Sequence, residues 1–141
     1  MTERNKQVFV YGTLTDPKQV ERVVTEFEFR GRATLHGLHR VDGEYPTLAP
    51  GGTVTGRVLR TPGIEAFDAY EGVASGLYVR VSVPWDGGET ERATGRSVDV
   101  YVGDPDALGV AVDWPGGGTF PERVRRFVSE EAVVVRPAGE A

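Results

Sequence analysis

The chain is organised around the stretch QVFVYGTLTDP at residues 7–17. Its apolar run at residues 8–10 is typical of a strand that is buried on both faces. Gly12 ends this run and allows both a sharp turn and a close approach to the backbone. Asp16 and Pro17 then predict the start of a helix, as its N-cap and its first helical residue. The turn between strand and helix leaves N–H groups that suit an anion or an oxyanion, although a plain strand–turn–helix corner has the same pattern.

A second stretch, IEAFDAYEG at residues 64–72, predicts a short helix that ends at Gly72. At about 100° per residue, Glu71 falls between Ile64 and Phe67 on the apolar stripe. Burial and the negative end of the helix dipole would both raise the pKa of this carboxyl, as a general base requires. The other interpretation is a terminal glutamate that bends out into solvent.

Composition limits the classes of function. The chain has 141 residues and predicts a single domain, 1–141, with its own core. It has no cysteine, which excludes disulfides, thiol nucleophiles and zinc–thiolate sites. The net charge of −5 disfavours a nucleic-acid partner, and no apolar run approaches the ~20 residues of a membrane span. The polar first residues lack the apolar core of a signal peptide. We therefore expect a cytoplasmic monomer or homodimer with no nucleic-acid or membrane partner.

The remaining pattern predicts mostly strands, and glycines interrupt them. This order predicts an α+β fold with a small mixed, barrel-like curled β-sheet and flanking short helices. Residues 114–118 predict a flexible flap or linker. The other predicted elements are a helix at 17–27, a strand at 29–41 bent at Gly31 or Gly37, a turn at 50–52, a strand at 53–60, antiparallel strands at 77–85 and 97–102, a turn at 103–106, a helix at 121–131 and a last strand at 132–135 that covers a sheet edge.

Three further features bear on a site. His36 and His39 are three apart on a predicted strand and face opposite sides, so we expect no metal site. Residues 44–48 contain Pro46, which denies the ladder an N–H and predicts an edge strand or an irregular crossing. On the strand at 77–85, Tyr78 lies on the face opposite Leu77 and Val79. That face suits a polar pocket, but an aromatic residue packed on an outward face would have the same pattern.

Four segments together resemble the γ-glutamylcyclotransferase-like superfamily. They match in order and spacing over residues 7–103, whereas residues 104–141 show no correspondence. The segments are VYGTL at 10–14, EYPTL at 44–48, FDAYEG at 67–72 and YVRV at 78–81.

The resemblance implies a small barrel and a reaction in which a γ-glutamyl amide cyclises to 5-oxoproline and releases an amine or amino acid. It implies that the backbone of Tyr11, Gly12, Thr13 and Leu14 binds the glutamyl part. It also implies that Glu71 is the acid/base and that Tyr78 matches the family tyrosine near the substrate. We expect no cofactor for such a reaction. The alternatives are a non-catalytic module of the same fold that binds an amino acid or anion, and a purely structural interaction domain.

Overall fold

The computed structural model describes residues 6–43, 45–86 and 97–138, with the side chain of Thr13 outside that description. Within these residues six strands form one mixed sheet, and short helices flank it. The elements are β1 Lys6–Val10, η1 Thr13–Thr15, α1 Pro17–Glu21, β2 Glu28–Val41, β3 Thr47–Thr61, α2 Ile64–Glu71, β4 Tyr78–Pro84, β5 Ser97–Gly103, α3 Pro105–Leu108, α4 Phe120–Glu130 and β6 Val134–Pro137.

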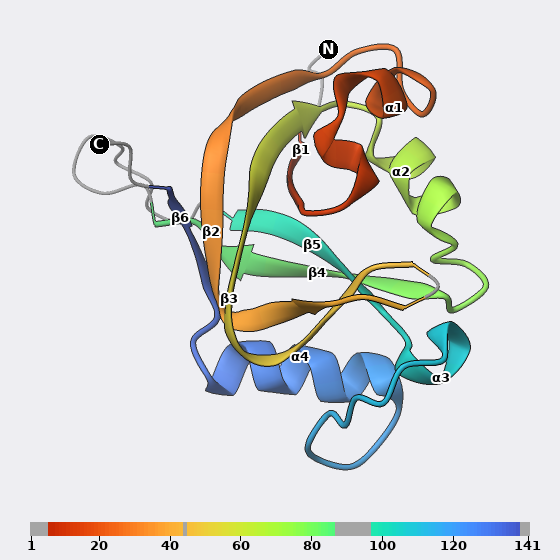
Figure 1. Ribbon diagram of the computed structural model, residues 1–141, viewed down its shortest axis with the longest axis vertical. Coiled ribbons are helices and arrows are strands. Elements are labelled where there is room, and N and C mark those ends of the chain that lie inside the picture. The colour runs from red at the N-terminus through yellow and green to blue at the C-terminus, as the bar shows by residue number, and fades with distance from the viewer. Residues whose placement is uncertain (1–5, 44, 87–96, 139–141) are drawn as a thin grey trace.

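The sheet curls until its two edges approach each other. The strand order is β4-β5-β1-β3-β2-β6, and β1 runs parallel to β5 while the other neighbours are antiparallel. Beyond β4, Trp85 forms a bridge to Val135 in β6, and the N–H of Asp86 donates to the Val135 carbonyl at 2.9 Å. Figure 1 shows β2 and β3 arching over β4 and β5, with α4 below the curl. The fold is therefore a half-barrel, which confirms the expected curled α+β sheet.

Strand β1 is buried on both faces, as its apolar run predicts. Phe9 packs inside the curl, in the cluster that includes Val124 of α4. Val8 and Val10 pack on the other side, in the cluster that includes residues of α1 and α2. The two apolar clusters pack on opposite faces of β1. The turn that follows Val10, the last residue of β1, therefore begins between them.

Glycines bend the long β2–β3 hairpin, as expected for Gly31 and Gly37. The β2–β3 register shifts at both places, between Phe29 and Gly31 and between His36 and Leu38. The predicted turn at residues 50–52 is wrong, because β3 runs through it without a break. Gly51 and Gly52, with φ of +96° and +77°, lie opposite the single residue Gly37 and form a bulge there instead.

Residues 45–48 lead into the first part of β3. Thr47 and Leu48 pair with β2 alone, because β1 pairs with β3 only at residues 57–61, so the segment has an edge position there, as one of the two interpretations expected. Pro46 precedes the first paired residue, Thr47, so its missing N–H costs the ladder nothing. Glu44 lies outside the described residues.

The helices at the two ends of the chain differ in how well the sequence predicts them. The Asp16 carboxylate accepts the N–H of Lys18, which confirms the N-cap, but α1 ends at Glu21 rather than at residue 27. The β-branched run at residues 23–25 disfavours a longer helix. Helix α4 begins one residue earlier than predicted, with Thr119 and Glu122 in a capping box.

Three smaller expectations need correction. Residues 105–108 form the one-turn helix α3 rather than only a turn. Trp114, expected in a flap, is buried and packs edge-on against Phe120 and Phe127. Leu77 precedes β4 and packs with the α1–α2 cluster, not with Val79. For Trp114 and Leu77 a tertiary contact decides the placement, whereas α3 follows from local residues, with Asp104 as its N-cap and Gly109 as its C-cap.

The contact between β1 and β3 predicts a sharp effect of one methyl group. A Cβ at Gly56 would collide with the backbone oxygen of Val10 and touch the ring of Phe9. We expect Gly56→Ala to lower the free energy of unfolding by about 1–3 kcal/mol, as for an overpacked core. Gly117→Ala is the matched control, because open space surrounds that position. Equal urea midpoints for the two variants would contradict the close strand contact.

Candidate active site

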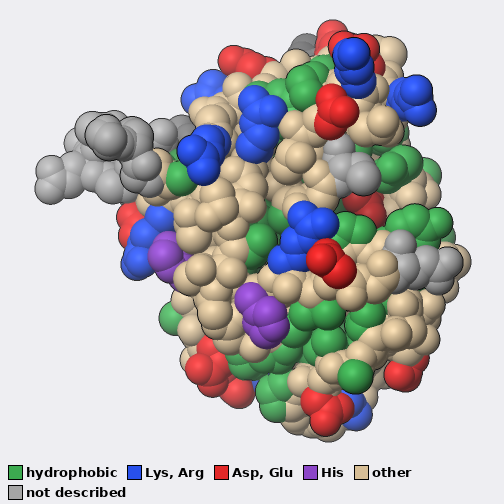
Figure 2. Space-filling model, in the orientation of Figure 1, with side chains coloured by type: hydrophobic (Ala, Val, Ile, Leu, Met, Phe, Trp, Pro, Cys, Tyr) green, Lys and Arg blue, Asp and Glu red, His purple; other side chains and the backbone are tan. Residues whose placement is uncertain are grey.

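A cavity of about 270 Å³ opens where β1 ends. The Gly12 turn, the segment before β3, the end of α2 and the start of β4 form its walls. The described residues that line it are Phe9, Val10, Tyr11, Gly12, Leu14, Tyr45, Pro46, Tyr70, Glu71, Leu77, Tyr78 and Tyr101. In Figure 2, by contrast, Lys and Arg side chains gather over the upper part of β2 and β3, and no Lys, Arg or His is among the described lining residues.

Glu71 brings a half-buried carboxyl to this cavity. It is the last residue of α2, where Gly72 ends the helix in the left-handed conformation with φ of +71°. Phe67, one turn earlier, is completely buried and holds the same helix face against the sheet. Burial raises the pKa of the Glu71 carboxyl from 4.5 to about 7. The group can therefore both accept and donate a proton near neutral pH.

The turn after β1 presents backbone donors. The N–H and the hydroxyl of Thr15 both donate to the Gly12 carbonyl, at 3.1 and 2.7 Å, and close a 3₁₀ turn. The N–H groups of Thr13 and Leu14 begin this turn and have no acceptor within it. A Cβ on Gly12 would lie 3.2 Å from the Pro46 ring, so the absence of a side chain lets the cavity walls approach each other.

Two arginines hold the ends of this turn. The Arg40 guanidinium of β2 donates to the Tyr11 carbonyl at 2.8 Å. The Arg57 guanidinium of β3 donates to the Thr15 carbonyl at 2.9 Å and stacks over the Phe29 ring at 3.9 Å. Because both contacts use carbonyl oxygens, they leave the N–H groups of the turn available.

Tyrosine hydroxyls fix the cavity walls. The Tyr11 hydroxyl donates to the Tyr101 carbonyl, and the Tyr78 hydroxyl donates to the Pro46 carbonyl, each at 2.6 Å. Burial raises the pKa of both phenols above the usual value, and the nearby Glu71 carboxyl adds to the rise. Both hydroxyls therefore stay neutral. The proton of Tyr78 is directed at Pro46 and not at Glu71.

A polar network behind the cavity holds α2 on the sheet. The Tyr101 hydroxyl donates to the Asp68 carboxylate at 2.7 Å. Arg80 lies 3.4 Å from both Asp68 and Asp99, and the Ser82 hydroxyl donates to Asp99 at 2.8 Å. Since Asp68 is one turn before Glu71, the network fixes the position of the helix end that carries the buried carboxyl.

The structure brings together most of the residues that the sequence singled out. Tyr11, Gly12, Leu14, Glu71 and Tyr78 line one cavity, and Thr13 lies in the same turn with its side chain outside the description. Sequence reasoning missed the other tyrosines of the cavity, Tyr45, Tyr70 and Tyr101. Two of them lie inside the quoted segments at 44–48 and 67–72, which was a usable signal.

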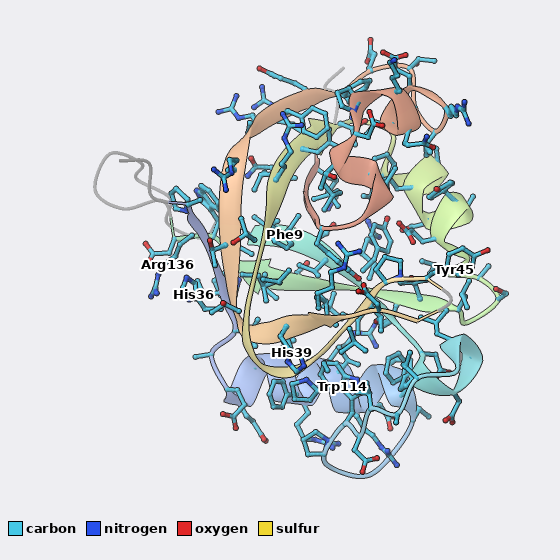
Figure 3. All side chains as sticks on the ribbon, viewed as in Figure 1. Phe9, His36, His39, Tyr45, Trp114 and Arg136 are labelled. Atoms are coloured by element: carbon cyan, nitrogen blue, oxygen red, sulfur yellow. The ribbon has the colours of Figure 1, made fainter. Side chains whose placement is uncertain are left out.

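The described residues show neither a cluster of metal ligands nor a membrane-spanning helix. His36 and Tyr45 lie at opposite sides of the molecule in Figure 3. Across residues 6–43, 45–86 and 97–138, no three His, Asp or Glu side chains gather as they would around a metal ion. Within the same ranges, no helix has both the length and the apolar character needed to span a bilayer.

The structure thus combines a half-barrel with a half-buried carboxyl in the cavity beside a strand-end turn. The chain belongs to the family described as "Gamma-glutamyl cyclotransferase, AIG2-like", which matches residues 8–115. No curated protein matches the chain in sequence.

Several solved structures share this fold. A γ-glutamyl cyclotransferase is 15% identical with a TM-score of 0.60, and the match covers 89% of this chain and 99% of that one. An uncharacterised Homo sapiens protein is 16% identical with a TM-score of 0.58 over the same shares. An Arabidopsis thaliana protein solved in solution is 26% identical with a TM-score of 0.52, over 93% of this chain and 87% of that one.

Proposed function

We propose that this protein is a γ-glutamyl cyclotransferase. The α-amine of the substrate attacks its own γ-carbonyl carbon, the new C–N bond closes the 5-oxoproline ring, and the original amide C–N bond breaks to release an amine. The observation that carries the proposal is the half-buried Glu71 carboxyl, whose pKa is raised to about 7, in the same cavity as the Gly12 turn. Family membership supports the class of reaction.

Glu71 would move the proton that this reaction requires. A substrate α-amine with a pKa of about 8 is mostly protonated at pH 7 and cannot attack a carbonyl. The Glu71 carboxylate would accept a proton from the ammonium group so that the free amine can attack. The ring nitrogen then loses a second proton, and the leaving amine takes up both protons and departs as an ammonium ion, so that the overall proton count is unchanged. Such general acid–base catalysis contributes about 10²–10⁴-fold.

The Gly12 turn would bind the glutamyl part. Its N–H groups are suited to the substrate carboxylate or to the oxygen that becomes negative as the amine attacks. In this proposal the backbone of Tyr11, Gly12, Thr13 and Leu14 provides the contacts. Holding the amine against the γ-carbonyl adds several powers of ten to the rate.

Product analysis tests the proposal. Purified protein is incubated with γ-glutamyl amides, and 5-oxoproline, glutamate and the free amine are quantified. We expect equal amounts of 5-oxoproline and amine without glutamate. Glutamate as the main product would indicate hydrolysis and contradict the proposal. Thermal stabilisation by the substrates without any product would favour a non-catalytic binding module, since a ligand at 100 times its Kd adds about 2.7 kcal/mol.

Tyr78 gives a prediction that depends on one hydroxyl. We expect Tyr78→Phe to change the free energy of unfolding by about 1 kcal/mol, the loss of one hydrogen bond to Pro46. We expect kcat/KM for a γ-glutamyl substrate to fall tenfold or more, because the hydroxyl lines the cavity beside Glu71 and holds the opposite wall. Unchanged kinetics with this small stability change would assign Tyr78 to the scaffold alone.

A further inference from the structure

Two exposed tyrosines stand at the mouth of the cavity. Among the described residues, Tyr45 and Tyr70 are the large hydrophobic side chains that remain exposed, at 55% and 51%. Both line the same cavity. Exposed aromatic area that gathers at a pocket is a typical sign of a ligand-binding surface.

Each ring is attached to a wall that the site itself fixes. Tyr45 precedes Pro46, whose carbonyl accepts the Tyr78 hydroxyl, and Tyr70 precedes Glu71 in α2. Figure 3 shows Tyr45 on the same side of the molecule as α2. Among the described residues neither ring stacks on another aromatic side chain. About half of each side chain is therefore open to solvent without an aromatic partner in the protein.

Tyr45 and Tyr70 lie where the leaving group of a γ-glutamyl substrate would extend out of the cavity. Phe9 and Val10, which are 1% and 4% exposed, close the inner end of the cavity. If the glutamyl part lies at the Gly12 turn, the substituent on the amide nitrogen must extend outward past the two exposed rings. Glu71 is the one charged side chain among the described lining residues. A leaving group with its own carboxylate would therefore find no cation there and would meet the Glu71 carboxylate.

We propose that Tyr45 and Tyr70 form an aromatic clamp that selects γ-glutamyl amides whose amine carries an aromatic or broad apolar group without a carboxylate. The inference rests on the proposed function, because that function defines which part of the substrate faces the mouth. Stacking on two rings and burial of their exposed area favour such a group over a small alkyl one.

A pair of substrates measures the clamp. The γ-glutamyl amides of phenethylamine and ethylamine share the reacting atoms and differ in the ring. We expect kcat/KM to be at least tenfold higher for the phenethyl compound. The ratio should fall to about threefold or less in Tyr45→Ala and Tyr70→Ala, while Tyr45→Phe and Tyr70→Phe keep it. γ-Glutamyl-phenylalanine, with the same ring and an added carboxylate, should react more slowly than the phenethyl compound. A ratio near one in the wild type, or an unchanged ratio in both Ala variants, would overturn the clamp.

Binding separates a failure of the clamp from a failure of the proposed function. If the wild-type protein releases 5-oxoproline from neither compound, the proposed function fails, and the dissociation constants of the same two compounds then decide the clamp. If the wild type converts the two compounds during the measurement, their dissociation constants are measured with the Glu71→Gln variant instead. At least tenfold tighter binding of the phenethyl compound, lost in Tyr70→Ala and kept in Tyr70→Phe, supports the clamp. Equal dissociation constants overturn it.

Discussion

A Glu71→Gln variant is expected to form 5-oxoproline with a kcat/KM about 10²–10⁴-fold below that of the wild type. The amide has nearly the shape of the carboxyl but can neither take the proton of the substrate amine nor return it to the leaving nitrogen. The fall should appear in kcat, because the missing step is proton transfer and not binding. Initial rates of 5-oxoproline release at several substrate concentrations measure it.

Glu65→Gln is the matched control for this prediction. Glu65 is an exposed acid in the first turn of the same helix, so the substitution makes the same change in charge away from the cavity. We expect its kinetics to equal those of the wild type. Comparable rates for Glu71→Gln and Glu65→Gln would show that the buried carboxyl does not carry the proton transfer.

Glu71→Gln should also make the folded protein more stable than the wild type at high pH. Burial raises the pKa of Glu71 from 4.5 to about 7 in the folded state. A raised carboxyl pKa means that the native state holds its proton more tightly than the unfolded chain. The native state of the wild type therefore loses stability as the pH rises from about 4.5 to about 7. Above pH 7 the folded protein carries the full energetic cost of an ionised Glu71. The shift corresponds to up to about 3 kcal/mol.

Urea unfolding at several pH values tests this second prediction. The free energy of unfolding of Glu71→Gln, relative to wild type, should increase by up to about 3 kcal/mol between pH 4.5 and pH 8. The relative stability of Glu65→Gln should stay constant over the same range. A difference between Glu71→Gln and wild type that does not change with pH would contradict a buried, titrating carboxyl.

Local patterns predict the parts of this fold that local chemistry determines. The apolar run of β1, the Asp16 cap and the Gly72 helix end all follow from residues within a few positions of each other. Gly51 and Gly52 show where such patterns stop being sufficient. Two glycines after a proline suit both a turn and a bulge, and only the pairing of β3 with β2 selects the bulge.

In the candidate site too, some residues follow from the local sequence and others only from the structure. Glu71 follows from its place on the apolar stripe of α2, and the Gly12 turn from the glycine that ends a buried strand. The contact between Asp68 and Tyr101 joins residues 33 positions apart, and that of Arg40 with the Tyr11 carbonyl spans 29. Such contacts depend on which strands are neighbours, so the residues that hold the site in place emerge only from the structure.

The pH dependence of kcat/KM is the sharpest test of whether the half-buried Glu71 carries the proton transfer. With a γ-glutamyl amide as substrate, we expect an acidic limb with an apparent pKa of about 7, the value to which burial raises the pKa of the Glu71 carboxyl. The residual activity of Glu71→Gln should lack this limb. An acidic limb near pH 4.5 in the wild type, or the same limb near 7 in Glu71→Gln, would contradict the account.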